Sequence, residues 1–480
     1  MNISKEADMN KARFAVIADT HYFSPTLTDG KRAYELRSDS DQKCLLESGA
    51  IIDSAFKTLA LDETIDSVLI CGDLTCNGEM ASHRELLEKL DFLSQFKKVY
   101  VITSTHDWAS DENAREFFGD EERKINDVAK IDELAEMYSR FGLDDAIARY
   151  DIENGLSSYV VKLCDGFRLF ALNDDQNGAG KSGYSKEHMK WIKDQLAEAK
   201  RAGDRVVAMQ HHVVLQHYTP LLTGGGICCG DRDWVAENFA ENGVELLFVG
   251  HSHMHNITEY KSPSGKKLVQ VNVGSLVGYP APIVKVNIDD EYISVHTEYV
   301  KKFKYNGSEH TLDYMLAHSR GVIEKIVDAA CSGEVKDFVE RCAALGLRSK
   351  ALEKLYFAIR RLFAYIKRVT VGEFSRLVNR LTFGKGINKK AADEASEEAV
   401  IEIIYNIFLN IFDGCVSRYK KGTPVYTVVA DFVSIPSRLL GKIPFAPKKI
   451  KAITDEIVEL VCLLMDDVYD NNYLRYKKGN

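Results

Sequence analysis

The sequence predicts a mixed α/β domain over residues 1–305, followed by an all-helical domain over residues 306–480. Three observations support this prediction. Short apolar runs in the first part alternate with amphipathic helical patterns, as in α/β proteins, whereas the pattern beyond about residue 305 is helical throughout. All 13 histidines lie at or before His318. Acidic residues outnumber basic ones in the first 300 residues, and the reverse holds in the remainder. The chemistry should therefore lie in the first part.

The predicted strands of the first part are short, apolar and rich in β-branched residues, which favour a pleated, buried surface. They cover residues 13–18, 67–71, 99–102, 158–163, 167–172, 205–209, 246–249 and 268–273. The turn Cys164-Asp165-Gly166 indicates a hairpin between two of them. Shorter strands continue to about residue 300 and suggest a second sheet layer.

Helices are expected where apolar residues recur with a period near 3.6. In the first part they cover residues 42–60, 79–96, 185–202 and 231–242; in the second part they include 351–369, 396–412 and 452–468. A polar loop is expected from the end of the first strand to about residue 40. Residues 110–155 are expected to form a polar, helical excursion over the site.

The composition favours a cytoplasmic protein. The N-terminal residues contain no continuous apolar run of the kind found in secretory signals. No stretch reaches the roughly 18 apolar residues that a transmembrane helix needs. The ten cysteines are scattered without CxxC pairs, which is typical of reduced thiols. The sequence does not predict an oligomeric state.

Carboxylate and imidazole side chains follow five of the predicted strands directly. They are Asp19 and His21, Asp73, His106 and Asp107, His211 and His212, and His251 and His253. A mixed Asp/His set is what two adjacent transition metals prefer, because a carboxylate can bridge both ions while imidazoles terminate each. Two such metals can activate a water for in-line displacement at phosphorus. Asp174 also follows a strand; we expect it to serve a simple turn, with support of the site as the alternative.

Five motifs occur within residues 13 to about 300 in the order D-x-H, G-D, x-x-H-D, H-H and G-H-x-H. This order resembles that of the calcineurin-like metallophosphoesterases, and the residues around the motifs are similar to those of a bacterial subgroup. The resemblance implies a four-layer αββα sandwich and two divalent or trivalent metal ions (Mn, Fe or Zn). It also implies hydrolysis of a phosphate ester by a metal-bridging hydroxide, with a phosphodiester slightly favoured over a monoester. The expected substrate is a phosphorylated small molecule or resembles a nucleotide.

The resemblance also implies residue roles. Asp19, His21 and His253 would hold the first metal, Asp73 would bridge, and His251 and His211 would complete the second, with His212 as the competing choice. His106 would assist the phosphoryl group or leaving group, and Asp107 would orient His106.

One motif departs from the family pattern. The family usually has Gly-Asn-His-Asp, whereas this chain has Ser104-Thr105-His106-Asp107. Thr105 falls at the position of a metal-binding asparagine and would offer the second metal only a hydroxyl. Because glycine often marks a positive φ, Ser104 raises the question of the local backbone. The alternative function is a degenerate site that serves binding or regulation.

A second alternative comes from residues 341–390, which carry 13 basic against two acidic residues, interleaved with aromatic ones. Such a stretch can bind nucleic acid or a membrane surface. The favoured interpretation is that it docks on the acidic first domain or is solvated.

Overall fold

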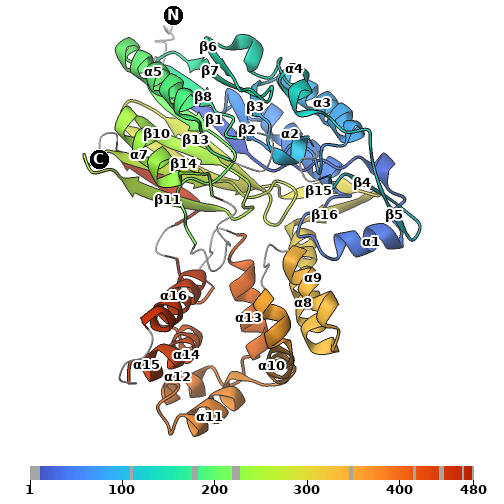
Figure 1. Cartoon of the computed structure of the whole chain (residues 1–480), viewed down its shortest axis with the longest axis vertical. Coiled ribbons are helices and arrows are strands. Elements are labelled where there is room, and N and C mark those ends of the chain that lie inside the picture. Colours follow the sequence, from blue (N-terminus) through green and yellow to red (C-terminus); the bar gives the residue numbers. More distant parts are fainter. Residues whose placement is uncertain are drawn as a thin grey trace, which may run out of the picture.

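The computed structural model describes residues 11–108, 112–175, 182–218, 228–344, 350–413, 418–442, 448–467 and 470–477. Two β-sheets pack face to face, and a group of helices lies below one end of this sandwich (Figure 1). The predicted α/β part followed by a helical part is confirmed.

The first sheet has the strand order β17-β14-β13-β1-β2-β3. Its strands are β1 (Ala12–Ile17), β2 (Ser67–Cys71), β3 (Lys98–Ile102), β13 (Pro282–Ile288), β14 (Tyr292–Tyr299) and β17 (Tyr473–Lys477). The strands β1, β2 and β3 are parallel, whereas β13 runs antiparallel to β1. The carboxyl ends of the three parallel strands therefore meet at one edge, where open α/β sheets bind ligands.

The second sheet has the order β11-β12-β10-β9-β8-β7-β6. Its strands are β6 (Ala148–Asp151), β7 (Ser157–Cys164), β8 (Phe167–Ala171), β9 (Arg205–Met209), β10 (Val244–Val249), β11 (Asn256–Lys261) and β12 (Lys267–Asn272). The predicted hairpin is confirmed, since β7 and β8 pair antiparallel. The strands β8, β9, β10 and β12 run parallel to one another.

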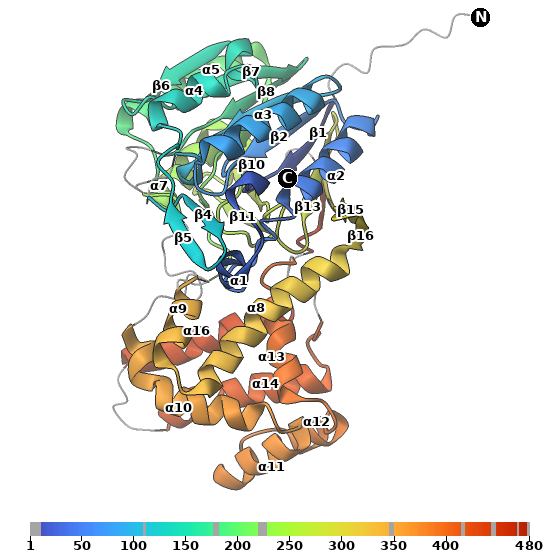
Figure 2. The same cartoon turned by 90° about the vertical axis from the view of Figure 1, so that its right-hand side faces the viewer.

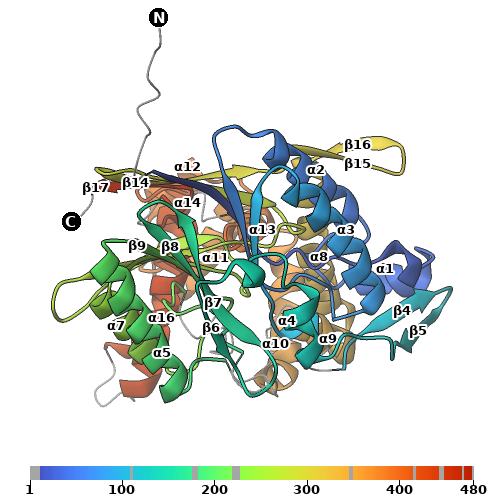
Figure 3. The same ribbon diagram turned by 90° about the horizontal axis from the view of Figure 1, so that it is seen from above.

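The layers follow from which face of each strand is apolar. Phe14 of β1 and Leu69 of β2 pack with Phe248 of β10 and Val271 of β12 in one buried cluster between the sheets. Burying side chains of this size contributes roughly 1.5–3 kcal/mol each. The helices α2 (Ser48–Leu61) and α3 (Met80–Ser94) cover the outer face of the first sheet, and α5 (Lys186–Ala202) and α7 (Arg232–Asn242) cover the second (Figure 3). This is the expected αββα sandwich.

Three segments differ from the prediction. The expected loop before residue 40 contains α1 (Arg32–Ser38), and the helix expected from residue 42 begins only at Ser48. The excursion at 110–155 contains the hairpin β4 (Arg115–Phe118) and β5 (Glu121–Lys124) and strand β6 besides the short helix α4 (Leu134–Met137). The hairpin buries Phe117 against Phe23 and Tyr34, a long-range contact that no local periodicity encodes.

The second part begins with the hairpin β15 (Lys302–Tyr305) and β16 (Ser308–Thr311). Its helices are α8 (Leu312–Ser332), α9 (Val335–Ala344), α10 (Lys350–Ile366), α11 (Val371–Leu381), α12 (Lys389–Glu394), α13 (Val400–Leu409), α14 (Pro424–Val433), α15 (Ile435–Leu440) and α16 (Lys448–Met465). The three predicted helices correspond to α10, α13 and α16. None of the helices in the described ranges is both long and apolar enough to cross a membrane.

The end of the chain corrects the expectation that residues 306–480 are all-helical. Strand β17 leaves the helices and pairs antiparallel with β14 at the edge of the first sheet. Both ends of the helical part are therefore attached to the sandwich. The helix α8 follows the hairpin β15–β16 (Figure 2), and β17 lies beside β14 (Figure 3). A domain boundary near residue 305 stays a prediction.

Candidate metal centre

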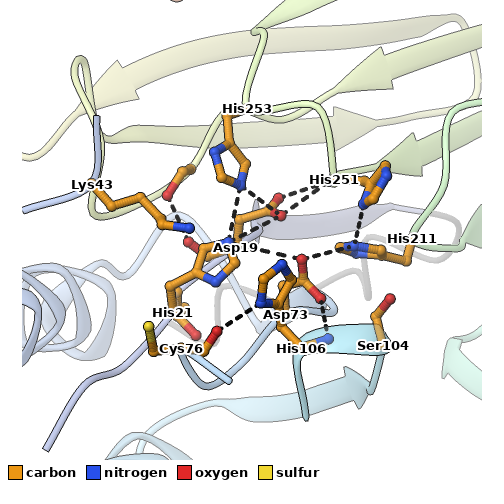
Figure 4. Close-up of polar contacts among 12 residues, drawn as sticks. Asp19, His21, Lys43, Asp73, Cys76, Ser104, His106, His211, His251 and His253 are labelled. Carbon is orange, nitrogen blue, oxygen red and sulfur yellow. Dashed lines mark hydrogen bonds and ion pairs between the residues drawn. The ribbon is translucent and has the colours of Figure 1, made fainter. Parts of the chain in front are cut away.

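The five predicted motifs converge at the carboxyl ends of β1, β2, β3, β9 and β10. Figure 4 shows their side chains pointing toward one another from loops that follow these strands. Parallel strands place their carboxyl ends at one edge, and the two sheets bring their edges together. Residues more than 200 positions apart in the sequence therefore surround one site.

The first group consists of Asp19, His21 and His253, whose ligand atoms lie close enough to hold one metal ion. The Nε2 atoms of His21 and His253 are 2.9 Å apart. Two imidazole nitrogens this close to each other could both bind one metal ion. Oδ1 of Asp19 lies 3.4 Å from Nε2 of His253 and 3.8 Å from Nε2 of His21.

The second group consists of Asp73, His211 and His251. Oδ2 of Asp73 lies 3.1 Å from Nε2 of His211, and Nε2 of His211 lies 3.2 Å from Nδ1 of His251. The same Asp73 oxygen is 3.8 Å from Nε2 of His21 in the first group. Asp73 therefore lies between the two groups, where a carboxylate can contact both ions.

The backbone at this site is strained in a systematic way. Five non-glycine residues adopt positive φ angles: Asp19 (51°), His21 (36°), Asp73 (50°), His251 (67°) and His253 (57°). Such conformations cost on the order of 1–3 kcal/mol each and persist where the surrounding structure imposes them. Here they turn the chain sharply after each strand, so that alternate side chains face the same point.

Two glycines make room for the ligand side chains. A Cβ at Gly72 would lie 2.6 Å from Nδ1 of His211, and a Cβ at Gly250 would overlap Oδ2 of Asp19. Gly72 also has a φ of 83°, which L-residues rarely adopt. The glycines in the G-D and G-H-x-H motifs are therefore required by close approach.

Burial and protonation fit a pair of cations. Asp19 and Asp73 are at most 1% exposed, and buried carboxylates need a compensating positive charge. Nδ1 of His211 donates to the backbone oxygen of Cys71 at 2.7 Å, which leaves Nε2 as a lone-pair donor for a metal. No described residue offers a hydrogen-bond partner to the buried Nδ1 of His21. Neutral imidazoles with carboxylates are a donor set that suits divalent transition metals.

The pKa values report the same charge balance in the absence of metal. Burial, reinforced by the ammonium of Lys43, lowers the pKa of His21 well below its usual value. Burial also opposes protonation of His211, but the carboxylate of Asp73 outweighs it and raises the pKa of His211 to about 10. A metal at the second group must therefore displace a proton from His211.

His106 lies at the edge of the first group, with its ring 4.9 Å from the ring of His21 in an edge-on arrangement. Its Nδ1 lies 2.7 Å from the backbone oxygen of Cys76 and 3.0 Å from Oδ1 of Asn77. Because both partners accept, Nδ1 carries the proton and Nε2 is the basic nitrogen. The backbone N–H of His106 donates to Asp73 at 3.2 Å, which ties this residue to the centre.

Asp107 does not have the role that was expected of it. Its carboxylate accepts from the backbone N–H groups of Leu74, Thr75 and Ser104 at 2.8–2.9 Å, rather than from the ring of His106. Asp107 is fully buried and holds together the loops after β2 and β3. The ring of His106 is instead oriented by Cys76 and Asn77.

The departures from the family motif are accommodated locally. Ser104 has a φ of −146°, an extended conformation open to any residue, so its replacement of glycine causes no backbone strain. Thr105 begins a single 3₁₀ turn, Thr105–Asp107, and is half-buried. Its role as a ligand stays a prediction.

His212, the alternative to His211, is held away from the centre. Its Nδ1 lies 3.1 Å from Oδ2 of Asp174, and its ring packs 4.4 Å from that of His251. The carboxylate of Asp174 also accepts from the backbone N–H groups of His211 and His212 at 3.4 and 3.2 Å. Asp174 therefore supports the site, contrary to the simple turn that we expected.

The sequence did not reveal Gln42 and Lys43. The side-chain nitrogen of Gln42 is placed 2.7 Å from Nδ1 of His253, and Lys43 is 8% exposed with its ammonium 3.6 Å from Asp41. Figure 4 shows Lys43 directed toward the ring of His21 and toward Asp19. Both residues lie in the segment that was predicted to be helical. Their position depends on a bridge between Lys43 and Gly278, which periodicity does not indicate.

A cavity of about 540 Å³ adjoins the centre at His106 and His253. Its polar lining comes from the first part of the chain and includes Arg37, Lys43 and Arg115. This volume is in the range of small-molecule sites.

The fold is an αββα sandwich, and its two candidate ligand groups have the composition and spacing that a dinuclear metallohydrolase needs. The chain belongs to the calcineurin-like phosphoesterases: the family model matches residues 12–255, just over half of its 480 residues. It is therefore a metal-dependent phosphoesterase, and the family implies two divalent transition metal ions.

Three solved structures are similar to parts of the chain. A dimetal phosphatase from Danio rerio is 13% identical, with 63% of this chain and 98% of that chain covered and a TM-score of 0.42. A purple acid phosphatase from yellow lupin seeds is 14% identical, with 63% and 53% covered and a TM-score of 0.41. A putative 5'-nucleotidase from Staphylococcus aureus is 12% identical, with 66% and 59% covered and a TM-score of 0.37. No curated protein sequence matches the chain significantly.

Proposed function

We propose that the chain hydrolyses a phosphate ester at two metal ions held by the two ligand groups. Asp19, His21 and His253 hold the first ion, and His211 and His251 hold the second. The observation that carries this proposal is the position of Asp73, whose Oδ2 is 3.8 Å from Nε2 of His21 and 3.1 Å from Nε2 of His211. A buried carboxylate between two imidazole groups is suited to bridging two cations.

The bound ions would supply an activated water and neutralise charge on the phosphoryl oxygens. His106 stands beside them with its Nδ1 directed at the backbone oxygen of Cys76. In its protonated form, His106 can donate from Nε2 a proton to the leaving oxygen or a hydrogen bond to the phosphoryl group. Lys43 adds a buried ammonium on the side of His21 and can bind a phosphoryl oxygen.

The charge of the cavity bears on the kind of ester. The three described cations of its lining, Arg37, Lys43 and Arg115, each lie within 4 Å of a carboxylate. A lining with little surplus positive charge favours the singly charged phosphodiester over the doubly charged monoester. We therefore place the diester slightly ahead.

The test uses metal-depleted protein with bis-p-nitrophenyl phosphate and p-nitrophenyl phosphate before and after addition of Mn²⁺. We expect Mn²⁺-dependent release of p-nitrophenolate, faster from the diester. The absence of turnover of either ester at every Mn²⁺ concentration would contradict catalysis and favour a binding or regulatory role for the site.

A further inference from the structure

The cavity beside the metal centre is completed by the helical part of the chain. Four of its lining residues come from α8, α13 and the turn after α13: Ile323, Phe408, Ile411 and Phe412. The same cavity is also lined by His106 and His253 of the metal centre. One end of the cavity is therefore suited to a phosphoryl group, and the other end is apolar.

The apolar wall continues onto the loop that carries a metal ligand. Met254, which directly follows His253, packs in a cluster with Tyr218, Ile411, Phe412 and residues of α16. Phe408 remains 37% exposed although it is a large aromatic residue next to this cluster. An exposed aromatic side chain that lines a cavity leaves apolar surface for a ligand to cover.

Hydrogen bonds fix the helical part against the sandwich at this point. Nε2 of His318, on α8, donates to the backbone oxygen of Asp41 at 2.8 Å, in the loop that carries Gln42 and Lys43. His217, which follows β9, lies 2.7 Å from Asp467 beyond α16. These two contacts therefore fix the helical part, and with it the apolar wall of the cavity, relative to the metal centre.

The charged lining limits what the cavity can accept. Of the described residues that line it, three are Lys or Arg and three are Asp or Glu. Arg37 pairs with Asp41 at 2.6 Å, and Arg115 pairs with Glu122 at 3.0 Å. Such a lining does not provide the excess of cations that nucleic acids or polyphosphates need.

We propose that this cavity binds the organic group of the substrate, and that this group is compact and apolar or aromatic, on an ester with a single phosphoryl group. This inference rests on the proposed phosphoesterase function and adds the substrate class. The helical part thereby acts as the specificity wall of the site: Phe408, Ile411 and Phe412 cover the organic group while the phosphoryl group lies at the ions.

The test measures binding of non-hydrolysable phosphonates to the Mn²⁺-loaded full chain by calorimetry, independently of turnover. Phenylphosphonate and methylphosphonate, each used both as the free phosphonate and as its singly charged monomethyl ester, share the phosphoryl end and differ in the apolar group. We expect phenylphosphonate to bind at least about tenfold more tightly. In Phe408→Ala and Ile411→Ala this advantage should fall to about threefold or less, whereas the affinity for methylphosphonate should be unchanged. Phe383→Ala is the matched control, because Phe383 is 92% exposed in the same part of the chain.

The outcomes are distinguishable. Equal binding of the two phosphonates, or an undiminished phenyl advantage in both cavity variants, would overturn the specificity wall while leaving the metal centre in place. Failure of both phosphonates to bind would overturn the phosphoryl site itself, and with it the proposed function. Tighter binding of a bisphosphonate such as methylenebisphosphonate than of phenylphosphonate would contradict the single-phosphoryl class.

Discussion

Oδ2 of Asp73 lies 3.1 Å from Nε2 of His211, and both side chains are at most 1% exposed. This contact couples protonation to metal binding: without metal the carboxylate keeps His211 protonated, and an ion at the same position replaces that proton. It also distinguishes His211 from its neighbour His212, which contacts Asp174 instead.

The first prediction concerns these two adjacent histidines. His211→Ala should lower the Mn²⁺ content from about two ions to about one per chain, because an ion loses a direct ligand. His212→Ala should retain about two ions, since His212 contacts Asp174 and packs against His251 but belongs to neither ligand group. Elemental analysis after gel filtration measures both. Equal loss of metal in the two variants would show that the assignment of the ligand is wrong.

The second prediction concerns His106. His106→Ala should lower kcat by about 10²–10⁴-fold, the usual contribution of a positioned acid or base, while the metal content stays the same. Asn77→Ala should have a smaller effect, because the backbone oxygen of Cys76 still holds Nδ1 of His106 at 2.7 Å. Steady-state kinetics with metal analysis on the same samples separates the roles. A His106→Ala enzyme with wild-type kcat would remove this residue from the mechanism.

The third prediction concerns Thr105, which stands where the family has asparagine. Thr105→Asn should tighten binding of the second metal by about tenfold, because an amide oxygen reaches farther and coordinates better than a hydroxyl. Thr105→Val, which keeps the shape of the side chain and removes the hydroxyl, is the matched control. It should weaken binding of the second metal or leave it unchanged. Calorimetric titration with Mn²⁺ measures this. Unchanged affinity in Thr105→Asn would place the residue outside the coordination sphere.

The fourth prediction concerns stability and pH at His188, which is remote from the metal ligands in sequence and stacks on Tyr150 with ring centroids 4.3 Å apart. Burial lowers the pKa of His188 to about 4. Its ordinary pKa is about 6.5, so between pH 6.5 and 4 the unfolded chain binds more protons than the folded one, and stability falls as the pH falls.

When the pH falls from 7.5 to 5.5, His188 should lower the free energy of unfolding by about 1 kcal/mol. Urea unfolding of the wild type and of His188→Phe at both pH values isolates the effect, because the variant keeps the aromatic stack without the titration. The pH-dependent loss should be smaller in the variant by that amount. An equal loss in both proteins would show that His188 does not titrate on unfolding.

The ligand set could be predicted because each motif directly follows an apolar strand. A strand that ends at Val249 fixes where Gly250, His251 and His253 emerge, and parallel pairing brings such ends together. The convergence of these residues therefore depends on the local sequence after each strand and on the parallel pairing of the strands. The apolar periods predicted the alternation of strands and helices, whereas the αββα layers were expected only because the motifs resemble the family.

What the sequence could not show depends on contacts between distant segments. Gln42 and Lys43 reach the centre because a short extended stretch bridges to Gly278, although its apolar spacing resembles a helix. Asp107 lies next to His106 in sequence, but its carboxylate is captured by three backbone N–H groups from two loops. Strand β17 pairs with β14 across almost 180 residues. Local patterns carry no information about such partners.

The most direct test of the dinuclear centre is a Mn²⁺ titration of the metal-depleted chain and of Asp73→Asn, with bound metal determined by elemental analysis. We predict saturation near two ions per chain for the wild type. For Asp73→Asn we predict one ion or fewer, and no measurable ester hydrolysis, because the carboxylate between the two ligand groups loses its charge. Saturation of the wild type at a single ion, or two ions in Asp73→Asn with unchanged turnover, would contradict a centre bridged by Asp73.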